Sequence, residues 1–390
     1  MPKSNKKLHK TNQKIYLDYA SSVSPNASSL HELGVKTRQK LENARSRVAS
    51  ILYSRPLEII FTSGGTESNN LAIQGVVLAG SKRKIPHIIT TNIEHPSVLE
   101  TFKVLAKRKL AQISLVGVEA NGIVDPKKIK KEIKKNTILV SVMYANNEIG
   151  TIQPIKEIAK EIRHYKKQHR RNNIFFHTDA VQAGNYLPLN VEQLGIDLLS
   201  LSGSKILNAG RAGVLFKKKN VPLFSIFAGG NQETGFRPGT ENVDAIVKFA
   251  DALEFAQKAK EKETKRLTIL RDYFIKKLPR GTLGKLGKNL VINGDLKNRL
   301  PNNVNITIPK IPSDLLVIEL SARGIYASSK SACKSGDGKA SHVIRAINPK
   351  VKDEDGSLRF SLGRATTKND IDYTIKSLAL ILSKLGKWYN

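Results

Sequence analysis

The chain has 390 residues, of which 40% are hydrophobic and 25% are charged, and its formal net charge is +32. This composition is typical of a soluble globular protein, and the length allows two domains with sizeable cores. No apolar run approaches the roughly 20 residues of a membrane span, and the basic N-terminus lacks the apolar segment of a signal peptide. The single cysteine excludes an intramolecular disulfide and a thiolate metal cluster built from this chain alone. We therefore expect a cytoplasmic protein without a membrane partner.

The excess of basic residues falls in short runs at residues 127–135, 164–171 and 217–219. A basic surface can bind nucleic acid or an acidic partner. The alternative is a lysine-rich composition carried on solvated helix faces. These runs contain few aromatic residues and match no nucleic-acid-binding motif, so we favour the second interpretation and expect no nucleic acid partner.

Strands and helices are predicted to alternate along the first part of the chain, after a basic tail at residues 1–14. The predicted strands cover residues 15–20, 58–62, 87–91, 112–116, 137–144, 173–179 and 196–201, and a further apolar strand ends at Phe216. The predicted helices cover residues 28–52, with Ser28 or Ser29 as N-cap, and residues 96–107, 126–134 and 155–169, and a further apolar helix follows the glycine-rich turn after Thr62 and runs to about Ala79. This alternation predicts an α/β fold with a mostly parallel sheet that is covered on both faces.

The last third of the chain has a different pattern. A long helix at residues 243–265 leads away from the predicted sheet, and strands follow at residues 290–293, 303–308 and 357–362 with helices around them. This pattern predicts a smaller α+β domain. We therefore divide the chain into the tail at 1–14, a large domain at 15–245 and a small domain at 246–390.

Polar side chains follow the ends of five predicted strands. They are Thr66, His95, Asn147, Asp179 and Lys205. Ligands of parallel α/β sheets bind at the carboxyl ends of the strands. The sequence therefore predicts that these five side chains meet in one crevice.

Lys205 stands at the mouth of a short apolar strand and before a turn that contains glycine. An ammonium group is costly to bury unless its charge is used, and one use is a Schiff base with pyridoxal 5′-phosphate (PLP). The alternative is a surface lysine between two strands. Asp179 closes an apolar strand, where a carboxylate either caps the next segment or holds the pyridine nitrogen of PLP. The glycine turn before Thr66 opens a helix whose N-terminus could bind a phosphate, although most such turns are only turns.

Three further residues have side chains that could take part in catalysis or in substrate binding. His95 could stack on a planar ring and move protons, or be a plain turn residue. Arg359 lies between apolar neighbours, where it could clamp a carboxylate or simply face solvent from a half-exposed strand. Cys333 lies in a polar stretch between Lys330 and Lys334, and these cations favour the nucleophilic thiolate. An activated thiol near a PLP pocket points to sulfur chemistry.

Motifs spread over most of the chain resemble those of cysteine desulfurases of the NifS/IscS type, within the class V aminotransferases. The matching stretches are Tyr16-Leu-Asp, Ser28-Ser-Leu-His, Phe61-Thr-Ser-Gly-Gly-Thr-Glu-Ser-Asn-Asn, Glu94-His-Pro-Ser-Val, Asn146-Asn-Glu-Ile-Gly-Thr, His177-Thr-Asp-Ala-Val-Gln, Ser202-Gly-Ser-Lys, Arg237-Pro-Gly-Thr-Glu-Asn, Ser331-Ala-Cys and Arg359-Phe-Ser-Leu-Gly-Arg. Each is modest, but together and in family order they are highly specific. The resemblance implies the fold-type I architecture of PLP enzymes.

The resemblance also implies a role for each candidate residue. Lys205 would bind PLP covalently and move the substrate α-proton, and Cys333 would take the sulfur of L-cysteine as a persulfide, leaving alanine. The cofactor would be held by Gly65, Thr66, His95, Asn147, Asp179, Gln182, Ser202, Gly203, Ser204 and Thr240, with Thr240 supplied by the second subunit of a homodimer. The substrate carboxylate would be bound by Asn147 and Arg359. The sulfur acceptor would be an iron–sulfur scaffold or a tRNA-thiolation relay. No resident metal is implied, with Cys333 as at most a transient iron–sulfur ligand.

Two features depart from the family pattern. Ser204 stands where the family usually has a histidine, which predicts weaker cofactor binding, and the segment between Ala20 and Asn26 is shorter by about one helix. The alternatives to a cysteine desulfurase are therefore a selenocysteine lyase or another class V aminotransferase, and a catalytically weakened homologue that acts as a basic scaffold. The last alternative conflicts with the joint presence of Lys205, Asp179 and Cys333.

Overall fold

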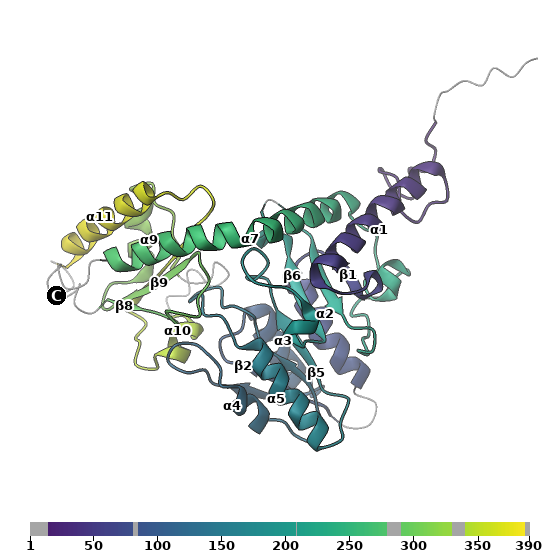
Figure 1. Cartoon of the computed structure of the whole chain (residues 1–390), viewed down its shortest axis with the longest axis horizontal. Coiled ribbons are helices and arrows are strands. Elements are labelled where there is room, and N and C mark those ends of the chain that lie inside the picture. The colour runs from purple at the N-terminus through teal and green to yellow at the C-terminus, as the bar shows by residue number, and fades with distance from the viewer. Residues whose placement is uncertain (1–14, 81–84, 208, 279–289, 330–339, 387–390) are drawn as a thin grey trace, which may run out of the picture.

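Two β-sheets organise the protein, whose computed structural model describes residues 15–80, 85–207, 209–278, 290–329 and 340–386 (Figure 1). The large sheet has the strand order β1-β7-β6-β5-β4-β2-β3. Its strands are β1 (Ile59–Thr62), β2 (His87–Thr91), β3 (Gln112–Val116), β4 (Thr137–Ser141), β5 (Phe175–Asp179), β6 (Leu198–Ser202) and β7 (Gly213–Lys217). Strands β3, β2, β4, β5 and β6 are parallel, and β7 is antiparallel to both of its neighbours. The predicted α/β fold with a mostly parallel sheet is confirmed.

Helices cover both faces of this sheet. They are α1 (Glu32–Leu52), α2 (Gly65–Gly80), α3 (Pro96–Lys107), α4 (Pro126–Lys131), α5 (Ile155–Gln168), α6 (Val191–Leu194) and α7 (Val243–Lys277), with short 3-10 turns at Pro56–Glu58, Gly203–Lys205 and Gln232–Gly235. Successive strand residues face opposite sides, so Ile88 packs with the α2 and α3 side chains while Ile89 packs with those of α1, α5 and α7. Because both faces are buried, the strands carry consecutive apolar residues rather than an alternating pattern.

A second, antiparallel sheet with the order β10-β9-β8 lies beside the C-terminal half of α7 (Figure 1). Its strands are β8 (Val291–Ile292), β9 (Asn303–Ile308) and β10 (Gly356–Ser361), and the helices that follow α7 are α9 (Ser313–Ser321), α10 (His342–Ile347) and α11 (Lys368–Leu385). Helix α7 joins the cores of the two sheets, since Phe249 is buried against the large sheet and Phe274 against the small one.

Helix α7 is longer than the sequence predicted, because it continues past residue 265 to Lys277. The added turns bury Leu267, Arg271 and Phe274 at helical spacing, so packing against the second sheet sustains the helix. The domain boundary at residue 245 stays a prediction, and α7 runs through it without a break.

The N-terminal segment differs from the prediction. The strand expected at residues 15–20 is wrong, because this segment turns at Asp18 and leaves Leu17 89% exposed. Helix α1 also begins at Glu32 rather than near Ser28, because the Nδ1 atom of His31 caps it by accepting the Gly34 amide. The Ser29 hydroxyl donates to Asp18 instead, at 2.8 Å.

The basic runs lie at the end of the large sheet where the parallel strands begin. Lys134 and Lys135 precede β4, Arg170 precedes β5 and Lys218 follows the antiparallel β7, and all four side chains are exposed. None of the helices in the described ranges is long and apolar enough to cross a membrane.

Candidate active site

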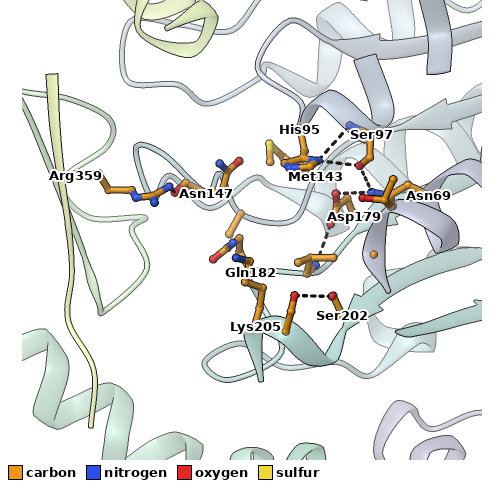
Figure 2. Close-up of a pocket in the computed structure, with 15 residues that line it drawn as sticks. Asn69, His95, Ser97, Met143, Asn147, Asp179, Gln182, Ser202, Lys205 and Arg359 are labelled. Carbon is orange, nitrogen blue, oxygen red and sulfur yellow. Dashed lines mark hydrogen bonds between the residues drawn. The ribbon is translucent and has the colours of Figure 1, made fainter. Parts of the chain in front are cut away.

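A cavity of about 260 Å3 opens at the carboxyl ends of the parallel strands (Figure 2). Ten of the candidate residues line it: Gly65, Thr66, His95, Asn147, Asp179, Gln182, Ser202, Ser204, Lys205 and Arg359. They come from segments that follow β1, β2, β4, β5 and β6, and from β10 of the small sheet. The crevice that the sequence predicted at the strand ends is therefore a single pocket, and the small sheet supplies one of its walls.

Asp179 is the last residue of β5 and presents a buried carboxylate to the cavity. Its Oδ2 atom accepts a hydrogen bond from Asn69 Nδ2 at 2.8 Å, and its Oδ1 atom accepts one from the Val181 amide at 3.0 Å. Burial raises the pKa of Asp179 above its ordinary value, although the neighbouring His95 and these two donors act in the opposite direction. A cationic group in the cavity would compensate this carboxylate.

His95 caps helix α3 with its Nδ1 atom, which accepts the Ser97 amide at 3.1 Å and lies 2.8 Å from Ser97 Oγ. The ring lines the cavity opposite Lys205, beside Met143 (Figure 2). Burial lowers the pKa of His95, and the Lys205 charge adds to this effect while Asp179 opposes it. Pro96 starts the helix directly after His95, and the capping bond from the Ser97 amide holds the imidazole ring in place.

The loop that carries His95 is anchored by a fully buried carboxylate, that of Glu94. Its oxygens accept hydrogen bonds from Thr91 Oγ1 at 2.6 Å and from the Met143 amide at 3.0 Å. Burial raises the pKa of Glu94 to about 8. Glu94 thus connects the end of β2 to the segment after β4 and holds two walls of the cavity together.

The side of the cavity near β1 and β6 is shaped to bind an anion. Helix α2 starts at Gly65, and the first two residues of this helix, whose amides have no partner within the helix, line the cavity. The hydroxyls of Ser202 and Ser204 lie 3.0 Å apart. A Cβ atom at Gly65 would lie 2.7 Å from Val181 Cγ2 and 3.3 Å from Ser202 Cβ. Glycine is therefore required at the point where the helix start meets the two serines.

Lys205 ends the 3-10 turn after β6 and is exposed at the rim of the cavity. Its backbone carbonyl accepts a hydrogen bond from Asn185 Nδ2 at 2.6 Å, which fixes the turn. Lys205 is therefore not the buried ammonium group that the sequence suggested, because it is exposed to solvent. Gln182 follows β5 and lines the cavity beside Lys205 (Figure 2).

Arg359 reaches the cavity from β10 and connects the two sheets. Its Nη1 atom donates to the carbonyl oxygen of Asn147 at 3.0 Å. Its Nε atom is buried and has no hydrogen-bond partner among the described residues. Burial lowers the pKa of Arg359, with Glu148 acting in the opposite direction. A carboxylate bound between Asn147 and Arg359 would satisfy the remaining donors of the guanidinium.

Three candidate residues are not part of this cavity. Gly203 lies beneath it, where its amide donates to Ala212 and a Cβ atom would meet the Gly210 carbonyl at 2.9 Å. Thr240 is exposed and lines a different hollow, together with Phe61 and Arg237. Cys333 lies outside the described residues.

Asn69 and Ser97 also line the cavity, and neither was among the residues predicted from the sequence. Asn69 stands one helical turn after Gly65, so helical spacing could have placed it on the same face. Ser97 follows His95 by two residues, within reach of a capping side chain. In the part of the chain that the structure describes, no group of three or more His, Cys, Asp or Glu side chains could hold a metal ion.

Comparisons with known proteins agree with this geometry. The family model "Aminotransferase class-V" matches residues 3–374. The chain is 41% identical to a protein named cysteine desulfurase IscS from Dictyoglomus turgidum, over 96% of this chain and 95% of the relative. It is also 41% identical to a protein of the same name from Methanosarcina thermophila, over 95% and 88% of the two chains.

A solved structure titled as a NifS-like protein superposes with a TM-score of 0.82, at 34% identity and 92% coverage of each chain. The matched relatives are therefore similar in sequence and in fold over nearly their full length. The chain belongs to the class V aminotransferase family and, within it, to the cysteine desulfurases of the IscS and NifS type.

Proposed function

We propose that the protein is a PLP-dependent cysteine desulfurase that converts L-cysteine to L-alanine and passes the sulfur to an acceptor protein. The observation that carries the proposal is the meeting of Lys205, Asp179 and Arg359, from three separate segments, at one cavity. An amine, a buried carboxylate and a guanidinium are what a PLP enzyme needs to hold its cofactor and the carboxylate of an amino acid. The names of the relatives support the same activity.

The residues of the cavity fit PLP. The start of α2 and the hydroxyls of Thr66, Ser202 and Ser204 would bind the phosphate, next to Gly65, where a Cβ atom would collide with Val181. Asp179 would pair with the ring nitrogen, and this pairing would offset the cost of burying a charged carboxylate. When bound, PLP acts as an electron sink for the bonds at the substrate α-carbon.

Around this cofactor, Gln182 would hold the ring hydroxyl and His95 would cover one face of the ring. Lys205 Nζ would carry the cofactor and then move the α-proton of the substrate. Asn147 and Arg359 would bind the substrate carboxylate, and the buried Nε of Arg359 supports this role.

Cys333 would accept the sulfur. Its thiol and L-cysteine give a Cys333 persulfide and L-alanine, so the substrate carbon–sulfur bond breaks as a sulfur–sulfur bond forms. The described chain stops at Ser329, whose neighbour Ser328 pairs with Arg359, and resumes at Ala340. The next residue, Ser341, donates to Glu148 beside Asn147. The described residues on either side of the segment that contains Cys333 therefore bond to Arg359, which lines the cavity, and to Glu148, the neighbour of Asn147.

We further propose a homodimer in which Thr240 completes the phosphate site of the other subunit. Two observations fit this proposal: Thr240 is exposed, and it lines a different hollow from the cavity of its own chain. The acceptor would be an iron–sulfur scaffold or a tRNA-thiolation relay protein.

The test is to measure alanine released from L-cysteine by the PLP-loaded protein with a reductant, beside the Cys333→Ser variant. Alanine from the wild type and none from the variant is expected. Alanine from both proteins would contradict the persulfide step and favour another class V reaction. No alanine from either, with PLP bound, would contradict the desulfurase and favour a scaffold.

A second readout is borohydride reduction, which attaches bound PLP irreversibly to its lysine. Peptide mapping is expected to find the label on Lys205 and to find none in Lys205→Ala. Lys218→Ala is the matched control, since this exposed lysine lies at the opposite edge of the sheet, and it should keep the label.

A further inference from the structure

A continuous chain of hydrogen bonds joins the buried carboxylate of Asp179 to the ring of His95 (Figure 2). Asn69 Nδ2 lies 2.8 Å from Asp179 Oδ2 and 2.9 Å from Ser97 Oγ. Ser97 Oγ lies 2.8 Å from His95 Nδ1. Asn69 and Ser97 are both buried, and each belongs to the first turns of a helix, α2 and α3 respectively.

The donor and the acceptor of each bond follow from the chemistry of the groups. A carboxylate only accepts, so the Asn69 amide nitrogen must point at Asp179, and its second hydrogen is then directed to Ser97 Oγ. The Ser97 backbone N–H can only donate, so His95 Nδ1 carries a lone pair toward it. The Ser97 hydroxyl, which accepts from Asn69, can then donate its own hydrogen to the same Nδ1 atom.

We infer that Asn69 and Ser97 are positioning residues that hold His95 as the neutral tautomer with its proton on Nε2. Two donors meet at Nδ1, and a proton placed there would lose the amide bond and face the amide hydrogen. Nε2 has no hydrogen-bond partner that the described residues supply, and the ring lines the cavity. His95 therefore presents an N–H donor to whatever the cavity binds.

The groups around His95 have opposing effects on whether its ring is neutral or protonated. Burial and the charge of Lys205 favour the neutral ring, while Asp179 and Glu148 favour the protonated ring. Asn69 matters here as well, because its bond to Asp179 stabilises the carboxylate without adding a charge. One amide thus favours the ionised form of Asp179, against the larger effect of burial, and, through Ser97, favours one tautomer of His95.

The inference rests on the proposed function and makes it more specific. A neutral ring whose Nε2 already bears hydrogen orients an acceptor atom and is a poor base at that atom. The α-proton would then be moved by Lys205 alone, and His95 would orient and cover the reacting groups. This departs from the sequence-based expectation that His95 moves protons.

The experiment is nitrogen-15 NMR of the holoenzyme labelled at histidine, with His95→Gln to assign the His95 signals. The two ring nitrogens have distinct shifts depending on which carries hydrogen, so the tautomer is read without any turnover. In the wild type we expect a protonated Nε2 and an unprotonated Nδ1 from pH 6.5 to 8.5. A protonated Nδ1, or a cationic ring at pH 7, would overturn the inference.

Variants test the two positioning residues. Ser97→Ala removes one of the two Nδ1 donors, so the midpoint for protonation of His95 should rise by roughly 0.7 pH unit, the shift that corresponds to an ordinary hydrogen bond. Ser97→Thr keeps the hydroxyl and should restore the midpoint. Asn69→Leu should raise it as well and should also move the pH titration of the cofactor absorbance, because Asp179 loses a donor.

Thr101→Val is the matched control. Thr101 is a buried hydroxyl one turn further along α3, bonded to Asn70 and to the Ser97 carbonyl, and it does not line the cavity. Its variant should keep the wild-type midpoint. Equal midpoints in Ser97→Ala and the wild type would overturn the role of Ser97. If alanine is not formed but the tautomer is as expected, the proposed function fails while this inference stands.

Discussion

Arg359 donates from Nη1 to the carbonyl oxygen of Asn147 at 3.0 Å, and this bond joins the small sheet to the loop after β4. The two residues lie far apart in the sequence and form one side of the cavity. The contact uses one guanidinium nitrogen, and the buried Nε has no partner among the described residues.

We predict that Arg359→Lys raises the KM for L-cysteine by about tenfold or more, because a lysine cannot make the paired, charge-assisted bonds of a guanidinium, which are worth about 1.5–3 kcal/mol each. Steady-state kinetics of alanine release gives the measurement. Arg323→Lys is the control, since Arg323 pairs with Glu319 on α9 and does not line the cavity. An unchanged KM in Arg359→Lys would show that this residue does not bind the substrate carboxylate.

We predict that Asp179→Asn lowers kcat by roughly 10- to 100-fold, the effect of losing one charged hydrogen-bond partner worth about 1.5–3 kcal/mol. The physical reason is that a neutral amide cannot keep the ring nitrogen of the cofactor protonated. Asp197→Asn is a matched control, because Asp197 is also a carboxylate whose pKa is raised by burial and it does not line the cavity. Equal losses of kcat in both variants would point to general destabilisation instead.

The segment that carries Thr240 depends on a buried ion pair between Arg45 and Glu233. Glu233 accepts two hydrogen bonds from Arg45 and one from the Phe61 amide, and it does so from a left-handed backbone with φ of 48°. Burial alone would lower the pKa of Arg45, but the bonds and charge of Glu233 raise it above its ordinary value. The pair therefore locks the segment after β7 onto α1 and β1.

Removing Glu233 leaves the buried Arg45 with only the exposed carboxylate of Glu42 as an ion-pair partner, so we predict that Glu233→Ala lowers the free energy of unfolding by about 3–5 kcal/mol. The exposed pair of Lys36 and Glu32 is the comparison, and Lys36→Ala should cost less than about 1 kcal/mol. Urea unfolding of both variants provides the check. Similar losses in the two variants would mean that the buried pair is not a special anchor.

His177 gives a prediction about acid stability. It is fully buried in β5, where its ring nitrogens contact Ser141 Oγ at 2.8 Å and Ser200 Oγ at 2.9 Å. Burial lowers the pKa of His177 from its ordinary 6.5 to about 3. Between these values the unfolded chain binds a proton that the folded protein does not bind. The stability that the uncharged His177 contributes is therefore fully present above pH 6.5 and is lost as the pH falls toward 3.

We expect the free energy of unfolding to fall by about 1.4 kcal/mol per pH unit for this one proton. The variant His177→Gln should have a shallower slope below pH 6, whatever its stability at neutral pH. In His169→Gln, a change at an exposed histidine, the slope should stay as in the wild type. Unfolding curves at pH 4, 5, 6 and 7 measure the slope of the free energy of unfolding against pH. Identical slopes in His177→Gln and the wild type would contradict the prediction.

Much of the secondary structure follows from the sequence. The predicted bounds at residues 87–91, 96–107, 112–116 and 303–308 coincide with β2, α3, β3 and β9. These segments have apolar residues at the spacing of a strand or of a helix, and signals such as Pro96 mark where they start. The segment at residues 15–20 has a strand-like composition but no neighbouring strand to pair with, so it forms turns. A strand needs a partner that local pattern alone does not supply.

The sequence by itself determined which side chains end the strands, and hence that Asp179, Lys205 and His95 share one edge of a parallel sheet. It also carried the family motifs, because these depend on residue type and spacing. The tertiary structure decided the contacts between distant segments: Asn69 with Asp179, Ser97 with Asn69, and Arg359 with Asn147. The physical reason is that periodicity reports only the local backbone, whereas a hydrogen bond depends on distances that the packing of helices and sheets sets.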